Sequence, residues 1–268
     1  MLNSSILRKP LFWLVLITVL LWLMVFSWPD NRLHLIFCNV GQGDAILITY
    51  KQTQILIDGG PDNKVLNCLS EHLPFWDRQL EAVFLTHPNA DHLIGLLMVL
   101  KRYQIKYFFS DFKIEGILEA KLLQKGDKVI IGRLSFLVLW PLNKNVNSKD
   151  VNDDCLVLEL IFDRFKTLLT GDITQKTEEK VLFEPVDVLK VAHHGSQYST
   201  SEEFLEKVRP VLAVISVGQN RFGHPSSETL ERLKKLGIKV LRTDDQQNIE
   251  IVSDGGEWWL GGTKGQAL

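Results

Sequence analysis

The apolar and polar positions of the first thirty residues differ from those of the rest of the chain. Residues 11–28 contain no charged side chain and are rich in leucine, valine and tryptophan, and about eighteen such residues are just enough for a helix to span a bilayer. Arg8 and Lys9 precede this run, and no small-residue cleavage site follows it. The pattern predicts an uncleaved transmembrane helix over residues 11–28, with a cleaved signal peptide as the alternative. The positive-inside rule then predicts cytoplasmic residues 1–10 and a domain of residues 31–268 outside the cell.

The next part of the chain alternates short apolar runs with turn residues. A meander of three antiparallel strands is predicted at residues 33–39, 45–49 and 54–58. Helical spacing predicts helices at residues 64–72 and 93–102. Further strands are predicted at residues 83–85, 106–109, 129–140 (two strands around Gly132-Arg133), 155–162 and 167–170.

The last third of the chain alternates helices with strands. Helices are predicted at residues 175–183, 201–208 and 226–236, and strands at residues 186–192, 211–217 and 239–243. Two strand-rich halves that each acquire helices predict a four-layer αββα sandwich, in which two sheets pack face to face with helices outside. The tail from Gly255 is weakly specified.

Composition limits the function classes without choosing one. The chain has 268 residues, of which 46% are hydrophobic and 23% charged, as expected for a globular protein with a sizeable core. A net charge of -2 provides no basic field for nucleic acid or anionic lipid, so a polyanion would have to be held locally. Cys38, Cys68 and Cys155 are far apart and form no C-x-x-C pair. We expect them to be small core residues rather than a disulfide framework or a zinc knuckle.

One turn concentrates the side chains that bind metal ions. His87, Asn89, Asp91 and His92 lie between the predicted strand at residues 83–85 and the helix that begins at residue 93. Two imidazoles and a carboxylate so close together are costly to bury without partners, and a metal ion is the commonest partner that satisfies all of them. The alternative is a polar strand-to-helix loop with Asp91 near the helix N-terminus, where a carboxylate is favourable.

Three further groups of polar residues follow predicted strands. Asp172 comes after a glycine, which permits close approach of the backbone, and an ordinary turn is the alternative. His193 and His194 end an apolar strand before a Gly-Ser turn, an arrangement that packing explains poorly and that favours a functional role. His224 lies just before a predicted helix, where a helix-entry turn capped by Ser226 is the alternative.

Six motifs stand in a fixed order and cover nearly all of the chain from Arg32 to about Val252. They are VGQGDAILI, LIDGG, LTHPNADHLIGL, LLTGD, VLKVAHHGS and VISVGQNRFGHPS. In this order they resemble the metallo-β-lactamase superfamily, and specifically the extracellular nuclease-like domain of ComEC competence proteins. The resemblance implies an αββα fold with a metal site between the two sheets. It also implies hydrolysis of a phosphodiester, in ComEC the strand of incoming DNA that is discarded.

The resemblance assigns metal ligation to five residues, His87, Asp91, His92, Asp172 and one of the late histidines. We favour His193 as the late ligand, because it lies nearest the strand end, with its neighbour His194 able to donate to the substrate. The metal ions would activate water as the nucleophile and stabilise charge on the phosphoryl oxygens.

Further roles are implied around this site. Asp91 belongs to the catalytic group through the metal that it binds, and His194 or His224 would stabilise or protonate the leaving group. Asp58 matches the aspartate that orients ligating histidines. Residues that support the site or line the cleft would be Gln42, Asp44, Asn89, Ser196 and Asn220.

The chain also departs from the family pattern. Asn89 stands where the motif has its second histidine, Asn39 stands where an aspartate is usual, and no histidine lies between His92 and His193. We therefore expect one complete site, made by Asp91, His92, Asp172 and His193. The second would be weaker and rich in oxygen, made by His87, Asp172, Asn89 and the loop at residues 152–154. Such ligands suit manganese or magnesium better than zinc, so one or two divalent ions of these three kinds are expected.

Three functions follow as hypotheses. The first is a membrane-anchored, metal-dependent phosphodiesterase that acts on DNA outside the cell in competence. The second is a hydrolase of the same fold that acts on another phosphodiester or ester, such as one of the cell wall or of lipid. The third is a catalytically weakened module that binds DNA or a partner. One predicted span cannot form a channel, so DNA uptake would require a separate channel protein.

Overall fold

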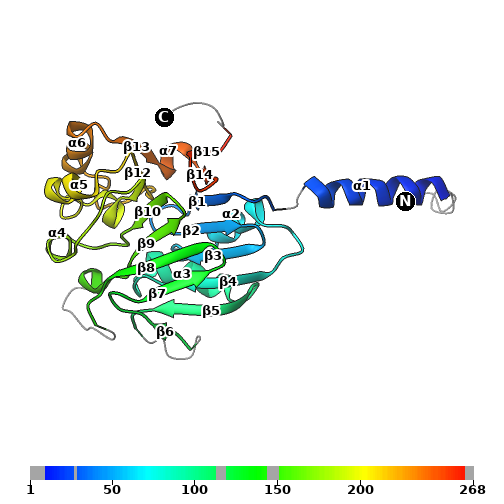
Figure 1. The fold of residues 1–268 in the computed structure, drawn as a ribbon, viewed down its shortest axis with the longest axis horizontal. Coiled ribbons are helices and arrows are strands. Elements are labelled where there is room, and N and C mark those ends of the chain that lie inside the picture. The colour runs from blue at the N-terminus through cyan, green and yellow to red at the C-terminus, as the bar shows by residue number, and fades with distance from the viewer. Residues whose placement is uncertain (1–9, 27–28, 113–118, 144–150, 263–268) are drawn as a thin grey trace.

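Two mixed β-sheets form the centre of the fold (Figure 1). The computed structural model describes residues 10–26, 29–112, 119–143 and 151–262. One sheet has the strand order β15-β14-β1-β2-β3-β4-β5-β6, and the other has the order β13-β12-β11-β10-β9-β8-β7. Each sheet contains antiparallel and parallel neighbours.

The first sheet carries the predicted meander, in which β1, β2 and β3 are antiparallel neighbours. Its strands are β1 (Leu33–Phe37), β2 (Ile46–Tyr50), β3 (Thr53–Ile57), β4 (Gln79–Phe84), β5 (Gln104–Ser110), β6 (Lys121–Leu122), β14 (Ile249–Ser253) and β15 (Trp258–Leu260). Helices α2 (Lys64–His72) and α3 (Ala90–Val99) connect its parallel strands β3, β4 and β5. The parallel strands end at a common edge, where functional side chains of such sheets collect.

The second sheet repeats this arrangement. Its strands are β7 (Lys128–Ile131), β8 (Leu134–Trp140), β9 (Val157–Phe162), β10 (Phe165–Leu169), β11 (Val188–Lys190), β12 (Leu212–Ile215) and β13 (Lys239–Arg242). The helices that follow them are η1 (Val151–Asp154), α4 (Gln175–Glu178), η2 (Ala192–Gly195), α5 (Glu202–Val208), α6 (Ser227–Lys235) and α7 (Thr243–Gln246). Strands β10 to β13 are parallel neighbours, so their carboxyl ends meet at one edge.

Three clusters of buried apolar side chains fix the layers. The first lies between the two sheets and contains residues of both, such as Phe37 of β1 and Phe136 of β8. The second packs the first sheet against α2 and α3, and the third packs the second sheet against α5 and α6. Burial of apolar surface is the main stabilising term in folding. The prediction of two packed sheets with helices on their outer faces is confirmed.

Helix α1 (Pro10–Phe26) has 17 residues and extends away from the two sheets (Figure 1). Proline suits the first helical position, because its missing N–H would have no partner there. The predicted transmembrane span over residues 11–28 is not supported, since no helix in the described ranges is both long enough and apolar enough to cross a membrane. Residues 1–9 of the predicted cytoplasmic segment, and Trp28, lie outside the described residues.

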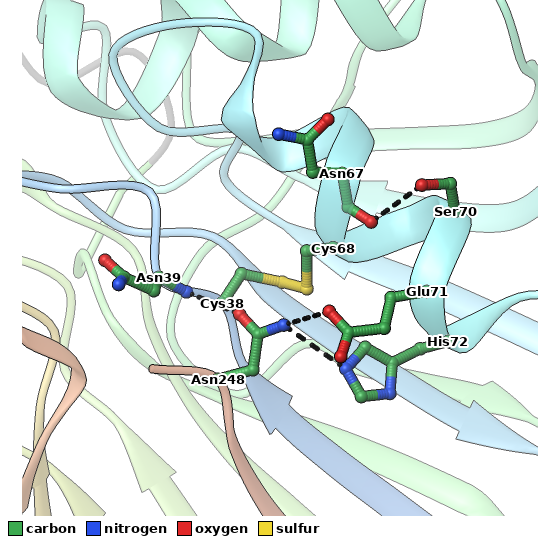
Figure 2. The surroundings of a disulfide bond; sticks show 8 residues. All are labelled: Cys38, Asn39, Asn67, Cys68, Ser70, Glu71, His72 and Asn248. Atoms are coloured by element: carbon green, nitrogen blue, oxygen red, sulfur yellow. Dashed lines mark hydrogen bonds between the residues drawn. A yellow bond between two sulfur atoms is a disulfide. The ribbon is translucent and has the colours of Figure 1, made fainter. Parts of the chain in front are cut away.

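A disulfide joins Cys38 and Cys68, whose Cα atoms are 5.8 Å apart, and this corrects the expectation that both are unpaired core residues. Figure 2 shows that the bond ties the end of β1 to α2. Beside it, the Asn248 side chain accepts a hydrogen bond from the backbone N–H of Asn39 at 2.8 Å and donates to Glu71 at 2.8 Å (Figure 2). The spacing of the cysteines in sequence does not reveal that α2 packs on β1. Cys155 is a buried free thiol, as expected.

The structure differs from the prediction in the start of helix α3 and in the tail of the chain. Helix α3 begins at Ala90 rather than at residue 93, because Asn89 adopts the extended conformation of an N-cap. Asp91 and His92 therefore lie in the first turn of this helix. The tail forms β14 and β15, and β14 pairs with β1 from the far end of the chain.

Candidate metal centre

The first sheet supplies an oriented carboxylate where β3 ends. Asp58 is buried and has a positive φ of 58°, which is uncommon for a residue other than glycine. Its carboxylate accepts hydrogen bonds from the backbone N–H of Thr86 at 2.8 Å and from the Thr86 hydroxyl at 2.7 Å. It also accepts one from Nδ1 of His92 at 2.8 Å. The strained backbone thus places a carboxylate that organises the start of the loop after β4.

Two glycines bring α3 against this loop. A Cβ atom on Gly95 would lie 1.8 Å from the carbonyl oxygen of Gly59, so only glycine fits there. This close approach permits two backbone hydrogen bonds. The N–H of Gly59 donates to the carbonyl of His92 at 2.7 Å, and the N–H of Gly95 donates to the carbonyl of Gly60 at 2.8 Å. The first turn of α3, with Asp91 and His92, is therefore fixed beside Asp58.

The second sheet supplies Asp172 after β10 and two histidines after β11. Gly171 has a positive φ of 52°, and a Cβ atom on it would lie 2.1 Å from Sγ of Cys155. His193 and His194 both adopt left-handed conformations, with φ values of 49° and 52°. Such conformations cost of order 1–3 kcal/mol each and cluster at functional sites. The ring of His194 is held by a hydrogen bond from its Nδ1 to the carbonyl of Ser216 at 2.8 Å.

Three buried imidazoles are oriented in the same way. The Nδ1 atoms of His92 and His194 donate to a carboxylate and a carbonyl. Nδ1 of His87 lies 3.0 Å from the Thr86 hydroxyl, whose hydrogen goes to Asp58, so here too Nδ1 is the donor. In its neutral form each ring therefore keeps the lone pair of Nε2, and in the described part of the chain these three buried Nε2 atoms have no hydrogen-bond partner. This is the arrangement of histidines that ligate a metal ion.

The free nitrogens converge on Asp172. Oδ2 of Asp172 lies 3.4 Å from Nε2 of His92 and 3.4 Å from Nε2 of His194, and Asp91 Oδ2 lies 3.3 Å from Nε2 of His194. Two ligand atoms that each lie about 2.1 Å from one ion are about 3.0 Å apart in an octahedral site and about 3.4 Å apart in a tetrahedral one. All four ligand atoms of Asp91, His92, Asp172 and His194 lie within 4.8 Å of one another. These residues therefore fit a divalent ion.

The electrostatics of the group also favour a bound cation. Burial alone would lower the pKa of His92, but the carboxylates of Asp172 and Asp58 outweigh it and raise that pKa well above its usual value. Burial, with the neighbouring His92, holds the pKa of His87 well below its usual value. Burial would raise the pKa of Asp172, yet His194, His92 and Lys190 lower it strongly. The buried carboxylates thus demand positive charge, which a proton or a metal ion can supply.

Comparison with known families agrees with this geometry. A family model described as the metallo-beta-lactamase superfamily matches residues 38–111, which contain Asp58, His87, Asp91 and His92. The chain belongs to the metallo-β-lactamase superfamily.

Two relatives match most of the chain, and one of them is named as a competence protein. ComE operon protein 3 of Bacillus subtilis (strain 168) is 32% identical over a match that covers 87% of this chain and 34% of the relative. Competence protein ComA of Neisseria gonorrhoeae is 30% identical, with 81% of this chain and 32% of the relative covered. The chain thus spans about a third of the length of these two relatives.

The fold itself is shared with solved structures. The crystal structure of the metallo-beta-lactamase fold protein YhfI from Bacillus subtilis matches with a TM-score of 0.58 and 12% sequence identity. The match covers 87% of this chain and 100% of that chain.

Of the two late histidines, His194 is the one whose ligand atom lies in the group with Asp91, His92 and Asp172, whereas the sequence favoured His193. The hydrogen bond to Ser216 turns the His194 ring inward. The His193 side chain is 28% exposed, and its Nε2 lies 4.0 Å from Oδ2 of Asp172, so it stands at the rim. Nε2 of His87 lies 3.9 Å from the same oxygen of Asp172.

Sequence reasoning missed Lys190, a fully buried lysine of β11. Its ammonium group pairs with Asp44, lies 3.4 Å from Oδ1 of Asp172 and donates to the carbonyl of Gly171 at 2.7 Å. Burial would lower the pKa of Lys190, but Asp44 and Asp172 raise it. Its signal in the sequence is a lone charge within the apolar run Val188–Val191. Asp44, predicted to line the cleft, is thus the buried partner of this lysine.

The other predicted residues occupy the loops around the site. Gln42 Oε1 accepts from the N–H of Gly218 at 3.4 Å, and the Asn89 amide donates to Asn152 at 3.1 Å. The Asn220 side chain donates to the carbonyl of His224 at 2.7 Å, within its own loop. Ser196 lines a cavity of about 470 Å³ together with His193 and His224. We call this space the rim cavity.

Proposed function

We propose that this chain is a metal-dependent phosphodiesterase that cleaves DNA outside the cell. The observation that carries the proposal is the convergence of unpaired Nε2 atoms from His92 and His194 on the carboxylate of Asp172. Two relatives that match most of the chain are named ComE operon protein 3 and competence protein ComA. Because competence is the uptake of DNA, we favour DNA over other phosphodiesters.

The residues of the site divide between holding the ion and handling the substrate. Asp91, His92, Asp172 and His194 would hold a divalent ion, which when bound supplies Lewis-acid activation of water and of the phosphoryl group. His224 lines the rim cavity, and its ring lies 5.6 Å from that of His193. We assign to His224 donation of a hydrogen bond or proton to the leaving oxygen.

A second, weaker ion would lie on the His87 side of Asp172. Within the described residues, the groups that fit an ion include no complete set on this side. The buried group of Asp44, Asp58 and His92 has its own partners, because Lys190 pairs with Asp44 and His92 donates to Asp58. We propose one tightly held ion, and manganese or magnesium as the activating metal because carboxylates supply half of the four ligands.

The location outside the cell is also part of the proposal. A disulfide between Cys38 and Cys68 is typical of proteins in an oxidising compartment. Helix α1 exposes large apolar side chains, among them Leu14, Leu20 and Trp22, and burying them in a lipid phase would be favourable. We propose that α1 attaches the chain to a membrane and that a separate channel protein takes up the surviving DNA strand. Flotation of the full chain with liposomes tests the attachment.

The experiment that tests the activity is DNA cleavage by the full chain across a metal series. We expect cleavage of labelled DNA with manganese, its loss in His92→Ala, and its retention in the matched variant His72→Ala, since His72 lies at the end of α2 outside the ligand group. Cleavage of bis-p-nitrophenyl phosphate but not of DNA would favour the hydrolase of another phosphodiester. Metal binding without cleavage of either substrate would contradict the proposed enzymatic activity and would favour a module that binds DNA or a partner.

A further inference from the structure

The rim cavity adjoins the metal centre and has aromatic walls. Tyr198 and Phe222 line it together with His193 and His224. Tyr198 is 69% exposed and Phe222 is 75% exposed. Large aromatic side chains that are exposed beside a catalytic centre need a reason, because burying them elsewhere would have stabilised the fold.

A continuous row of rings leads from this cavity to the metal ligands. The rings of Phe222 and His224 are stacked with centroids 5.9 Å apart. The ring of His224 is 5.6 Å from that of His193, whose Nε2 lies 4.0 Å from Oδ2 of Asp172. The rings of His224 and His193 thus connect Phe222 to the metal ligands, so a strand that lies along this row can reach both.

Both aromatic residues stand on loops that hydrogen bonds hold in place. The Asn220 side chain accepts from the N–H groups of Phe222 and His224 at 3.0 Å each. The loop that carries Tyr198 is fixed by Arg232, which donates to the carbonyls of Gln197, Ser199 and Thr200 at 2.7–2.8 Å. The two loops thus hold Phe222 and Tyr198 in place before a ligand binds, and this lowers the entropic cost of binding.

The charge of the cavity indicates which part of a substrate fits there. Among the described residues, its lining includes the carboxylate of Glu228 but neither lysine nor arginine. The lining thus offers a phosphate no lysine or arginine to pair with, whereas a flat, uncharged ring would stack on the aromatic walls. Small polar groups at Ser226 and Ser227 can donate to and accept from the edge of such a ring.

We propose that the rim cavity is a base-stacking site for single-stranded nucleic acid, which holds an unpaired base on Phe222 and Tyr198 while a phosphate of the same strand lies at the metal centre. A base inside a duplex hides its faces, so this site selects single strands. Sequence preference is weak, because every base presents such a face. The inference rests on the proposed function, since it names the substrate class of that same site.

The test measures binding of the full chain to two fluorescent oligonucleotides in the presence of calcium, by anisotropy. One is a 12-mer of thymidine, and the other has the same phosphates on abasic sugars. We expect the thymidine strand to bind roughly 5- to 100-fold more tightly. Phe222→Ala and Tyr198→Ala should each remove most of this difference without weakening binding to the abasic strand. Phe222→Tyr should keep it, and so should the matched control Phe75→Ala, because Phe75 is 77% exposed and does not line the rim cavity.

The outcomes separate the two proposals. Equal binding of both strands by the unaltered protein, failure to bind either, or discrimination that survives in both alanine variants would overturn the base site. If the protein cleaves DNA with manganese but binds both strands equally, the phosphodiesterase proposal is supported and the base site is contradicted. Discrimination without cleavage supports the base site and contradicts the phosphodiesterase.

Discussion

Nδ1 of His92 lies 2.8 Å from Oδ2 of Asp58, and this contact fixes which nitrogen of His92 faces Asp172. The same carboxylate accepts from the Thr86 hydroxyl, to which the ring of His87 donates. Asp58 thus orients the imidazoles of His92 and His87 without lying in the ligand group itself. Its replacement should therefore change the affinity for the metal ion.

Replacement of Asp58 by asparagine should weaken metal binding about 10- to 100-fold, the usual effect of losing a partner of ligating histidines. Isothermal titration with manganese measures it. Asp62→Asn serves as the control, because Asp62 lies four residues on in the same loop and pairs with Lys64 at the surface. Unchanged affinity in Asp58→Asn would show that the histidines need no such support.

Lys190 should be needed for stability, because it pairs two buried carboxylates. Lys190→Met removes the ammonium partner of the buried Asp44, and breaking a buried ion pair costs about 3–5 kcal/mol in comparable cases. The free energy of unfolding from urea titration, without added metal, measures the loss. Asp44→Asn combined with Lys190→Met should cost less than the sum of the two single changes. Additive losses would show that the two residues do not interact.

The disulfide between Cys38 and Cys68 should stabilise the domain mainly by constraining the unfolded chain. Its sequence separation of 30 residues corresponds to roughly 3–4 kcal/mol in the loop-entropy estimate. The double variant Cys38→Ser, Cys68→Ser should unfold at lower urea concentration than the oxidised protein. A reducing agent should destabilise the unaltered protein and leave the double variant unchanged. Equal sensitivity of both proteins to the reducing agent would contradict the assignment.

Asp111 gives a pH dependence away from the ligand group. Burial, with the nearby carboxylate of Asp154, raises the pKa of Asp111 from 3.8 to about 7. Between these values the folded protein binds more protons than the unfolded chain, so stability falls as the pH rises. From pH 5 to pH 7 the unaltered protein should lose about 2 kcal/mol more than Asp111→Asn. Parallel losses in urea titrations at the two pH values would show that Asp111 titrates normally.

The sequence predicted the layers well because apolar periodicity reports which faces are buried. Helix α2 has the predicted bounds, and the β1–β3 meander and most strands of the second sheet were located. Strands β14 and β15 were missed because β14 pairs with β1 from nearly the other end of the chain, and β15 pairs with β14. The disulfide was missed for the same reason, since it joins two elements whose contact only the fold creates.

The site was predictable in its residue types but not in its geometry. Asp91, His92 and Asp172 were singled out from turns after strands, and the fold brings them together. The choice between His193 and His194 depended on a left-handed turn and on the carbonyl of Ser216, neither of which a sequence displays. Lys190 was hidden because its role comes from Asp44, which is 146 positions away in the chain and adjacent in space.

The most direct test of the metal centre is an anomalous-difference map from a manganese-soaked crystal of the full chain. The geometry predicts a strong peak in coordination with Asp91, His92, Asp172 and His194, whose ligand atoms lie within 4.8 Å of one another, and no such peak in crystals of His194→Ala. A manganese peak that none of these four side chains contacts, or an undiminished peak in His194→Ala, would contradict the proposed centre and the hydrolase that depends on it.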